Sequence, residues 1–252
     1  MYTIICVRVF GLIIWAYMQS NLIYKGLVSC LMPTSGRDEY VSRSIWQFLA
    51  QDYQNAELII LDDGYEPCVE VVPEHPRIRY EYLRRGCSLG EKRNLLCEMA
   101  LGDILVHWDD DDWFSNDRLS YQVKALRHSK ADASGSSRLY VYEATKKRGF
   151  EYRYPRSARP WVAGGTLCFT KSLWKRNSFP HLSRGEDTAF LWNSVKKRIV
   201  PTRRHDYYVA RLHSGNTSER SLRDRRWRPV TEAQILQLPA MASANLESEV
   251  GT

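Results

Sequence analysis

The first half of the chain alternates strand-like runs with stretches of helical periodicity, and this alternation limits the fold more than any other feature. Four runs have the length and pattern of strands: residues 27–32, 57–64, 77–83 and 103–108. Helical stretches follow at 38–51, 90–100 and 116–129. Strands joined by helical crossovers lie parallel in one sheet. The sequence therefore predicts an α/β fold with a Rossmann-like, mostly parallel central sheet flanked by helices.

The helical stretches also predict which side chains face the core. In residues 90–100 the spacing places Leu95, Leu96 and Met99 on the inner side. Asn116 precedes the third stretch and has the side chain of a typical N-cap.

Polar clusters follow three of the four strand-like runs. They are "PTSGR" at 33–37, "DDG" at 62–64 and "DDDD" at 109–112. Ligands of parallel sheets bind beyond the carboxyl ends of the strands. We therefore expect these three clusters to meet at one edge of the sheet and to form a ligand site.

The acidic cluster raises a question of charge, because four adjacent aspartates follow the apolar run "ILV". Alternate residues of an extended chain point the same way, so Asp109 pairs with Asp111 and Asp110 with Asp112. Two carboxylates on one face can bind Mg²⁺ or Mn²⁺, which in turn bridges to phosphate oxygens. The alternative is that one or two of them cap the following helix and the others are solvated.

The second half is less regular. The pattern predicts a hairpin from strands 138–144 and 150–155, a strand at 164–170, a helix at 185–198 and a strand at 206–213. Residues 231–252 are small and polar, which predicts a loose tail. Acids in the first turn of 185–198 and bases in its last turn suit the helix dipole.

The net charge of +7 favours an anionic partner, namely a nucleotide phosphate, a nucleic acid or a membrane surface. The basic stretch "RSLRDRRWRPV" at 220–230 could contact such a partner. No known nucleic-acid-binding pattern accompanies it, so nucleic acid is the least favoured of the three. Peripheral contact with a membrane surface, or contact with an anionic acceptor, is the preferred interpretation of this stretch.

The cysteines and the N-terminus bear on location. No two of the six cysteines have CxxC spacing, and most flank apolar residues, so we expect reduced core thiols in a cytoplasmic protein. Residues 3–18 are apolar but include Arg8, and the uninterrupted part 9–18 is shorter than the roughly 20 residues that span a bilayer. Residues 1–26 therefore form either a membrane-associated segment or a leader outside the folded domain.

Together these motifs resemble a family 2 glycosyltransferase with the GT-A fold. The resemblance rests on "VSCLMPTSGR", "AELIILDDG", "GEKRNLLCEMALGDILVHWDDDDW" and "GEDTAF", which occur in the family's order. It implies a domain over 27–218, with a nucleotide-binding half at 27–115 and a smaller, irregular acceptor half at 116–218. Residues 219–252 then form a basic segment and loose tail.

The resemblance implies a binding site for a nucleotide-sugar, with a UDP-sugar as the expected donor, and for Mn²⁺ or Mg²⁺. The implied metal ligands are Asp111, Asp109 and His213. The implied nucleotide-sugar contacts are Pro33, Thr34, Arg37, Asp62, Asp63, Lys92, Arg93, Asp109 and Asp110. Ordinary turn chemistry, a solvated helix face or a surface histidine remain the alternatives at these positions.

The resemblance assigns the general base to Asp187, since transfer to a hydroxyl requires removal of its proton. Glu186 then binds the acceptor or supports the helix start, and inversion at the anomeric carbon is implied by the family. Charge at a helix N-terminus is the alternative for both acids. Candidate sugar or acceptor walls are Trp113, Trp161, Gly164 and Gly165, and a plain core position is the alternative for each tryptophan. The acceptor is a glycan, a lipid-linked glycan or a protein.

Two other functions remain open on the residues alone. A nucleotidyltransferase would share the sheet and the acidic site, but "PTSGR" is a poor match to its glycine-rich loop. A non-catalytic protein that binds cations or nucleic acid is the other, although the EF-hand pattern is absent.

Overall fold

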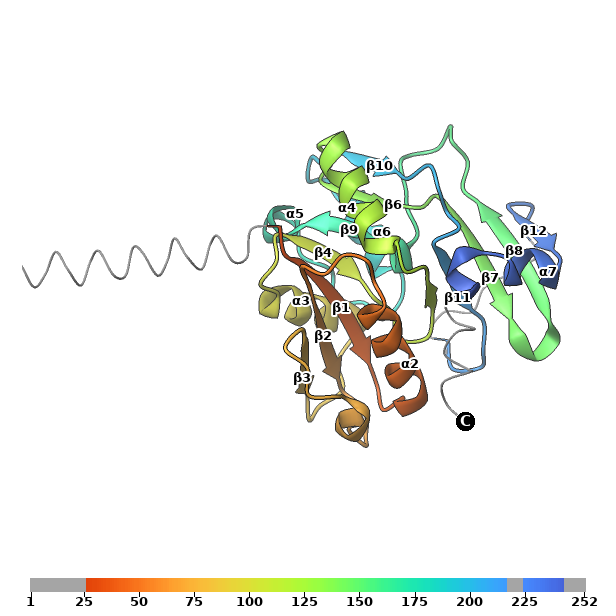
Figure 1. The fold of residues 1–252 in the computed structure, drawn as a ribbon. Helices are drawn as coiled ribbons and strands as arrows, with labels where there is room; N and C mark the ends of the chain where they lie inside the picture. Colours follow the sequence, from red (N-terminus) through yellow and green to blue (C-terminus); the bar gives the residue numbers. More distant parts are fainter. Residues whose placement is uncertain (1–25, 217–223, 243–252) are drawn as a thin grey trace, which may run out of the picture.

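The computed structural model describes residues 26–216 and 224–242, which form two β-sheets with helices packed around them (Figure 1). The larger sheet has the strand order β10-β6-β9-β4-β1-β2-β3. Its strands are β1 (Val28–Thr34), β2 (Ala56–Asp62), β3 (Ile78–Tyr82), β4 (Ile104–His107), β6 (Ala133–Gly135), β9 (Cys168–Thr170) and β10 (Ile199–Pro201). All pairings in this sheet are parallel except those of β9 with β4 and β6. The predicted mostly parallel sheet is confirmed.

Helices cover both faces of the larger sheet. They are α2 (Asp38–Leu49), α3 (Leu89–Met99), α4 (Arg118–Ser129), α5 (Lys171–Arg176) and α6 (Glu186–Trp192). On one face Met32 of β1 shares a core with side chains of α2 and α4, and on the other Leu31 packs with Leu96 of α3. Burial on both faces explains why the central strands are almost continuously apolar.

The smaller sheet has the order β12-β8-β7-β11-β5 and lies beside the larger one (Figure 1). Its strands are β5 (Trp113–Phe114), β7 (Arg138–Glu143), β8 (Arg148–Arg153), β11 (Tyr208–Arg211) and β12 (Trp227–Val230). The predicted hairpin is confirmed, because β7 and β8 pair antiparallel from Arg138↔Arg153 to Glu143↔Arg148. Short 3₁₀ turns occur at Cys68–Val71, Ala144–Lys146 and Gly164–Thr166.

Three details of the predicted helices are wrong. The last helix ends at Trp192 rather than at residue 198, because Asn193 adopts an extended conformation with ψ 178° and the chain turns toward β10. Asp117, not Asn116, occupies the N-cap position of α4. On α3, Leu96 is buried as expected, but Leu95 and Met99 are only partly buried, while the more deeply buried positions include two cations.

The loose tail predicted from residue 231 is also wrong for part of its length. Helix α7 (Glu232–Leu236) begins with a capping box between Thr231 and Gln234. Ile235 of this helix is fully buried, and β12 pairs antiparallel with β8 just before it. The described part of the C-terminal segment thus completes the smaller sheet.

Among residues 26–216 and 224–242 no helix is both long and apolar enough to cross a membrane. The apolar stretch 3–18 lies outside the described residues. Of the cysteines within them, Cys30, Cys68, Cys97 and Cys168 are buried free thiols and Cys87 is a half-buried one. Burial raises the pKa of the Cys68 thiol to about 12, so it stays protonated, and its sulfur accepts the Arg37 backbone N–H at 3.0 Å.

Candidate active site

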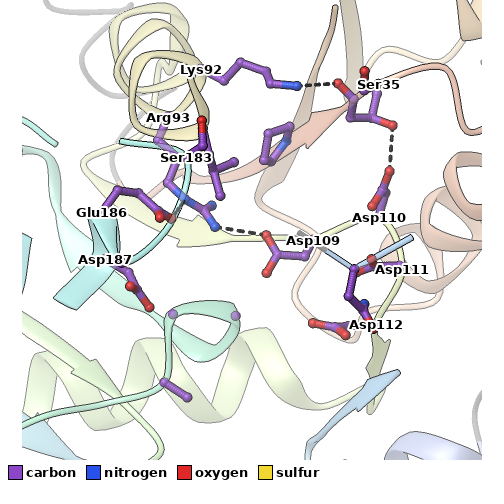
Figure 2. Close-up of a pocket in the computed structure, with 18 of the residues that line it drawn as sticks. Ser35, Lys92, Arg93, Asp109, Asp110, Asp111, Asp112, Ser183, Glu186 and Asp187 are labelled. Atoms are coloured by element: carbon purple, nitrogen blue, oxygen red, sulfur yellow. Dashed lines mark hydrogen bonds and ion pairs between the residues drawn. The ribbon is translucent and has the colours of Figure 1, made fainter. Parts of the chain in front are cut away.

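The three polar clusters meet in a cleft of about 590 Å³ at the carboxyl ends of β1, β2 and β4. This volume is in the range of small-molecule sites. Figure 2 shows Ser35 and the four aspartates on one side, Lys92 and Arg93 above them, and Glu186 with Asp187 across the opening. The expectation that the fold would bring these segments together is confirmed.

Most of the predicted site residues line this cleft. They are Pro33, Thr34, Arg37, Asp63, Lys92, Arg93, Asp109, Asp110, Asp111, Trp161, Gly164, Gly165, Glu186 and Asp187. His213 lies next to this lining, against Asp111. Asp62 and Trp113 do not line the cleft, and both have other roles.

Side-chain bonds lock the three strand ends together. Thr34 at the end of β1 donates from Oγ1 to Asp110 Oδ2 across 2.6 Å. The buried Lys92 on α3 donates to the Thr34 carbonyl oxygen at 2.8 Å and pairs with Asp63 after β2. Asp63 also accepts from the Cys87 backbone N–H at 3.1 Å. The solvated helix face that was the alternative for Lys92 is therefore wrong.

Asp62 is a structural residue rather than a ligand contact. It is fully buried and accepts backbone N–H groups of Gly36 (3.0 Å), Gly64 (2.9 Å) and Cys68 (2.8 Å), and the Tyr80 hydroxyl at 2.8 Å. Burial alone would raise its pKa, but these donors hold the pKa of Asp62 below its usual value. Asp62 thus fixes the loops that follow β1 and β2, as the alternative turn reading predicted.

Every aspartate of the acidic cluster has a polar partner, and Arg37 is shared by two of them. Asp109 lies 3.2 Å from Arg93 Nη2, and Arg37 Nη1 lies 3.1 Å from Asp110 Oδ1. Asp111 Oδ2 contacts both Arg37 Nη1 at 2.9 Å and His213 Nε2 at 3.0 Å. Asp112 accepts the Tyr208 hydroxyl and the Arg211 backbone N–H.

The two central aspartates of this cluster differ in acidity. Burial and the neighbouring Asp111 raise the pKa of Asp110 to about 7, although Arg37 and Thr34 oppose the shift. Burial also acts on Asp111, but His213 and Arg37 outweigh it and lower the pKa of that carboxyl. Of these two aspartates, Asp111 is therefore the one held more firmly in its charged form.

Two of the three predicted metal ligands lie together. Asp111 Oδ2 and His213 Nε2 are 3.0 Å apart, and a carboxylate with an imidazole suits Mn²⁺. Asp109 points to Arg93 instead. Within the described ranges no group of three or more His, Cys, Asp or Glu side chains could hold a metal. The residues fit a cation that takes its remaining ligands from phosphate and water.

Arg93 joins the two ends of the cleft. Its guanidinium is almost fully buried, with Nε 2.9 Å from Glu186 Oε1 and Nη2 facing Asp109. Burial lowers the pKa of such a group, but the two acids and Asp187 more than restore it, so Arg93 stays charged. Burial raises the pKa of Glu186 despite this partner. The ion pair of Glu186 with Arg93 thus connects the start of α6 to α3.

Asp187 is the carboxylate that remains directed into the opening. Its Oδ1 accepts the Thr188 backbone N–H at 2.6 Å, which holds the side chain at the start of α6. Gly164 packs directly against it, since a Cβ there would lie 2.1 Å from Asp187 Oδ2. A Cβ at Gly165 would lie 2.4 Å from the Tyr208 hydroxyl. The glycine pair, predicted as part of a sugar or acceptor wall, lines the cleft and also leaves room for these two polar side chains.

Of the two tryptophans predicted as walls of the site, only Trp161 lines the described cleft. Trp113 on β5 packs in a small core with Tyr142, Val209 and Ile235, so it is not a wall of the site. Trp161 lines the cleft, and its Nε1 donates to Thr188 Oγ1 at 3.1 Å.

Sequence reasoning missed several residues of the site. Tyr152 and Trp227 line its outer end, and Tyr208 lies under the acidic cluster. Beneath the cleft the fully buried Arg118 donates from Nη2 to the carbonyl oxygens of His107 at 2.7 Å and Gly165 at 2.9 Å. Nothing in the sequence marks Arg118, an arginine in the first turn of an amphipathic helix, as part of a site. Trp227 could have been noticed, because it is a tryptophan within the basic stretch at 220–230.

Two solved structures share this architecture. TarS residues 1–349 of S. aureus, in complex with UDP-GlcNAc, matches with a TM-score of 0.59 and 17% identity over 87% of this chain and 72% of TarS. The mannosyltransferase PcManGT from Pyrobaculum calidifontis, in complex with GDP-Man and Mn²⁺, matches with a TM-score of 0.58 and 16% identity over 96% and 84% of the two chains. Similarity at this level identifies the fold, which is of the GT-A type.

Sequence comparison identifies the family. A Rickettsia felis protein described as an uncharacterized glycosyltransferase is 25% identical over 193 residues, which cover 72% of this chain and 32% of that protein. The match therefore spans about a third of that relative. The profile of glycosyl transferase family 2 matches residues 29–186, which is more than half of the 252 residues. The chain belongs to glycosyl transferase family 2, as its motifs indicated.

Proposed function

We propose that this chain is an inverting glycosyltransferase that moves a sugar from a nucleotide-sugar to an acceptor hydroxyl. The observation that carries the proposal is one continuous cleft with an acidic, strand-end site on one side and the half-buried carboxylate of Asp187 on the other. A nucleotidyltransferase would need the first side and would leave Asp187 and the aromatic outer end without a role.

In this proposal the nucleotide lies across the ends of β1 and β2. Asp63 contacts the base, while Pro33 and Thr34 line the nucleoside pocket, and Asp109 and Asp110 face the ribose and diphosphate. Strand ends of parallel sheets are the usual place for such ligands. A UDP-sugar is the expected donor, in line with the UDP-GlcNAc complex of TarS, and the GDP-Man complex of PcManGT makes GDP the first alternative.

Asp111 and His213 would hold a divalent cation, Mn²⁺ or Mg²⁺. When bound, that cation supplies charge stabilisation to the departing diphosphate. Arg37 is the neighbouring cation: Nη1 contacts Asp110 and Asp111, and Nη2 donates to the Gly215 carbonyl oxygen at 3.0 Å. This arrangement ties the His213 loop to the acidic cluster.

Asp187 would remove the proton of the acceptor hydroxyl as it attacks the anomeric carbon. Its Oδ1 is engaged with the Thr188 N–H, so Oδ2 beside Gly164 is the oxygen that receives the proton. Glu186 and Arg93 position the start of α6, which fixes the distance between the base and the donor end. The acceptor is a glycan, a lipid-linked glycan or a protein, and the basic segment around β12 is the proposed point of peripheral membrane contact.

The deciding experiment is isothermal titration of UDP, and then GDP, into the purified protein with and without Mn²⁺. We expect metal-dependent binding that Asp111→Ala abolishes, while the exposed Asp52→Ala leaves it unchanged. If no nucleoside diphosphate binds in the presence of metal, the proposal is wrong. Binding that persists in Asp111→Ala would reject the assigned metal ligand but keep the donor site.

A further inference from the structure

The outer end of the cleft is lined by three aromatic side chains that the donor site does not use. They are Tyr152 on β8, Trp161 in the segment before Gly164, and Trp227 on β12. The ring centroids of Tyr152 and Trp227 lie 4.8 Å apart, and those of Tyr152 and Trp161 lie 5.8 Å apart. The three rings therefore form one continuous wall, although they come from separate parts of the sequence.

The wall is held in place by the fold around it. Trp227 and Tyr152 are directly opposed partners in the antiparallel pairing of β12 with β8. The Tyr152 hydroxyl accepts from Arg226 Nη1 at 3.0 Å, and all three rings pack against the core of the molecule while staying partly exposed. A partly exposed ring with fixed neighbours loses little conformational entropy when a ligand covers it.

The wall adjoins the proposed base. Trp161 Nε1 donates to Thr188 Oγ1 at 3.1 Å, and Thr188 follows Asp187 directly. A ligand seated on these rings would thus present its edge to a carboxylate. The ligand should therefore have an apolar face for the rings and a polar edge for the carboxylate. A pyranose ring has both, because its C–H face is apolar and its edge carries hydroxyl groups. Aromatic walls combined with a few polar groups select such ligands.

We propose that Tyr152, Trp161 and Trp227 form an acceptor subsite for a pyranose ring, so that the acceptor is a saccharide. The inference rests on the proposed function, and it narrows the acceptor to a single chemical class. The attacking hydroxyl belongs to the sugar that lies on the rings.

The test is saturation-transfer NMR with methyl glycosides of glucose, galactose, mannose, rhamnose and N-acetylglucosamine, on the full chain with UDP and Mn²⁺. We expect at least one glycoside to bind, with one C–H face receiving most of the saturation. Trp227→Ala should weaken that binding about tenfold, and Trp227→Phe, which keeps a ring, about threefold or less. Trp46→Ala, an exposed tryptophan on α2 away from the cleft, is the matched control.

Hydrolysis of the nucleotide-sugar by water distinguishes a failure of the saccharide subsite from a failure of the proposed function. We expect Trp46→Ala to keep wild-type UDP binding and donor hydrolysis, and circular dichroism shows that Trp227→Ala is folded. If the donor is hydrolysed but no glycoside binds, or if binding survives Trp227→Ala and Trp161→Ala unchanged, the saccharide subsite is wrong and a protein or lipid acceptor takes its place. Absence of any nucleotide binding would overturn the proposed function and the acceptor assignment together.

Discussion

The two ends of the cleft are built in opposite ways. At the donor end charged side chains bridge three strand ends, through Lys92 with Asp63, Thr34 with Asp110, and Arg93 with Asp109. At the acceptor end the walls are aromatic rings. Within the described residues, the carboxylate of Asp187 at this end accepts one hydrogen bond, from the backbone N–H of the adjacent Thr188.

The difference shows where each end gets its rigidity. The donor end inherits it from a parallel sheet that is buried on both faces, so its carboxylates are fixed before a ligand arrives. The acceptor end depends on α6, a helix of 7 residues, and on the pairing of β12 with β8. We expect substitutions at the donor end to destabilise the fold, and substitutions at the acceptor end to change acceptor binding while the fold is kept.

The largest effect should come from Asp187→Asn. The amide keeps an oxygen for the Thr188 N–H but cannot take a proton, so release of UDP from the donor should fall by about 10²–10⁴-fold. UDP affinity should stay unchanged, because the donor end is built from other elements. Coupled detection of UDP and calorimetry measure the two quantities.

Glu186→Gln is the matched variant for that measurement. It keeps a hydrogen bond to Arg93 and should lower turnover less than Asp187→Asn does. The reverse order of the two effects would make Glu186 the base and remove Asp187 from the chemistry.

Arg93→Met should have the next largest effect, a loss of stability, because Arg93 contacts acids at both ends of the cleft. It leaves Asp109 and the buried Glu186 without their shared cation. Removal of one partner from a buried ion pair costs about 3–5 kcal/mol of unfolding free energy. Urea denaturation measures this loss.

Arg43→Met serves as the control for Arg93, because the one ion pair of Arg43 within the described residues is with the exposed Glu39 on the same helix. It should leave the denaturation midpoint nearly unchanged. A loss below about 1 kcal/mol for Arg93→Met, as for exposed pairs, would mean that water reaches its two acids.

The donor end could be predicted from sequence because its signals are local. Each strand of the parallel sheet is an apolar run, and each polar cluster follows its strand directly, so topology alone brings Asp63 and Asp110 together. The same signals could not separate Asp62 from Asp63. Which of two adjacent carboxylates faces the ligand depends on backbone donors supplied by Gly36 and Cys68, and no local pattern reports them.

At the acceptor end Asp187 and Trp161 were predicted, but Tyr152 and Trp227 were missed, because their contacts are distant in sequence. Trp227 joins the site only through the pairing of β12 with β8, and Trp113 leaves it because β5 turns toward the core around Ile235. Neither the aspartates before Trp113 nor the basic residues around Trp227 indicate these long-range contacts. Arg118 was missed for the same reason, since its partners are carbonyl oxygens of His107 and Gly165.

A smaller effect is expected for Gly164→Ala. The new Cβ would lie 2.1 Å from Asp187 Oδ2, so the carboxylate must move. Misplacement of a catalytic group by about 1 Å can cost roughly 100-fold in rate, so UDP release should fall by up to that factor while UDP affinity is kept. Gly86→Ala is the control, because a Cβ there meets nothing within 4 Å. Equal activity of the two variants would contradict the role of Asp187.

The smallest effect concerns the pH dependence of stability at the donor end. The folded-state pKa of Asp62 is lowered, so the unfolded chain binds more protons between the folded pKa and the unfolded value of about 3.9. The stability that Asp62 contributes is thus complete above the unfolded value and is lost as the pH falls through the folded one. Asp62→Asn should flatten this part of the curve, as measured by urea denaturation between pH 5 and pH 2.5.

Tyr80→Phe tests the cause of that dependence. It removes one of the four donors to Asp62 and leaves the three backbone N–H groups in place. The slope of stability against pH should then lie between those of the wild type and Asp62→Asn. A slope equal to that of Asp62→Asn would mean that the Tyr80 hydroxyl alone holds the charge of Asp62. The loops after β1 and β2 would then be tied by β3 rather than by their own backbone.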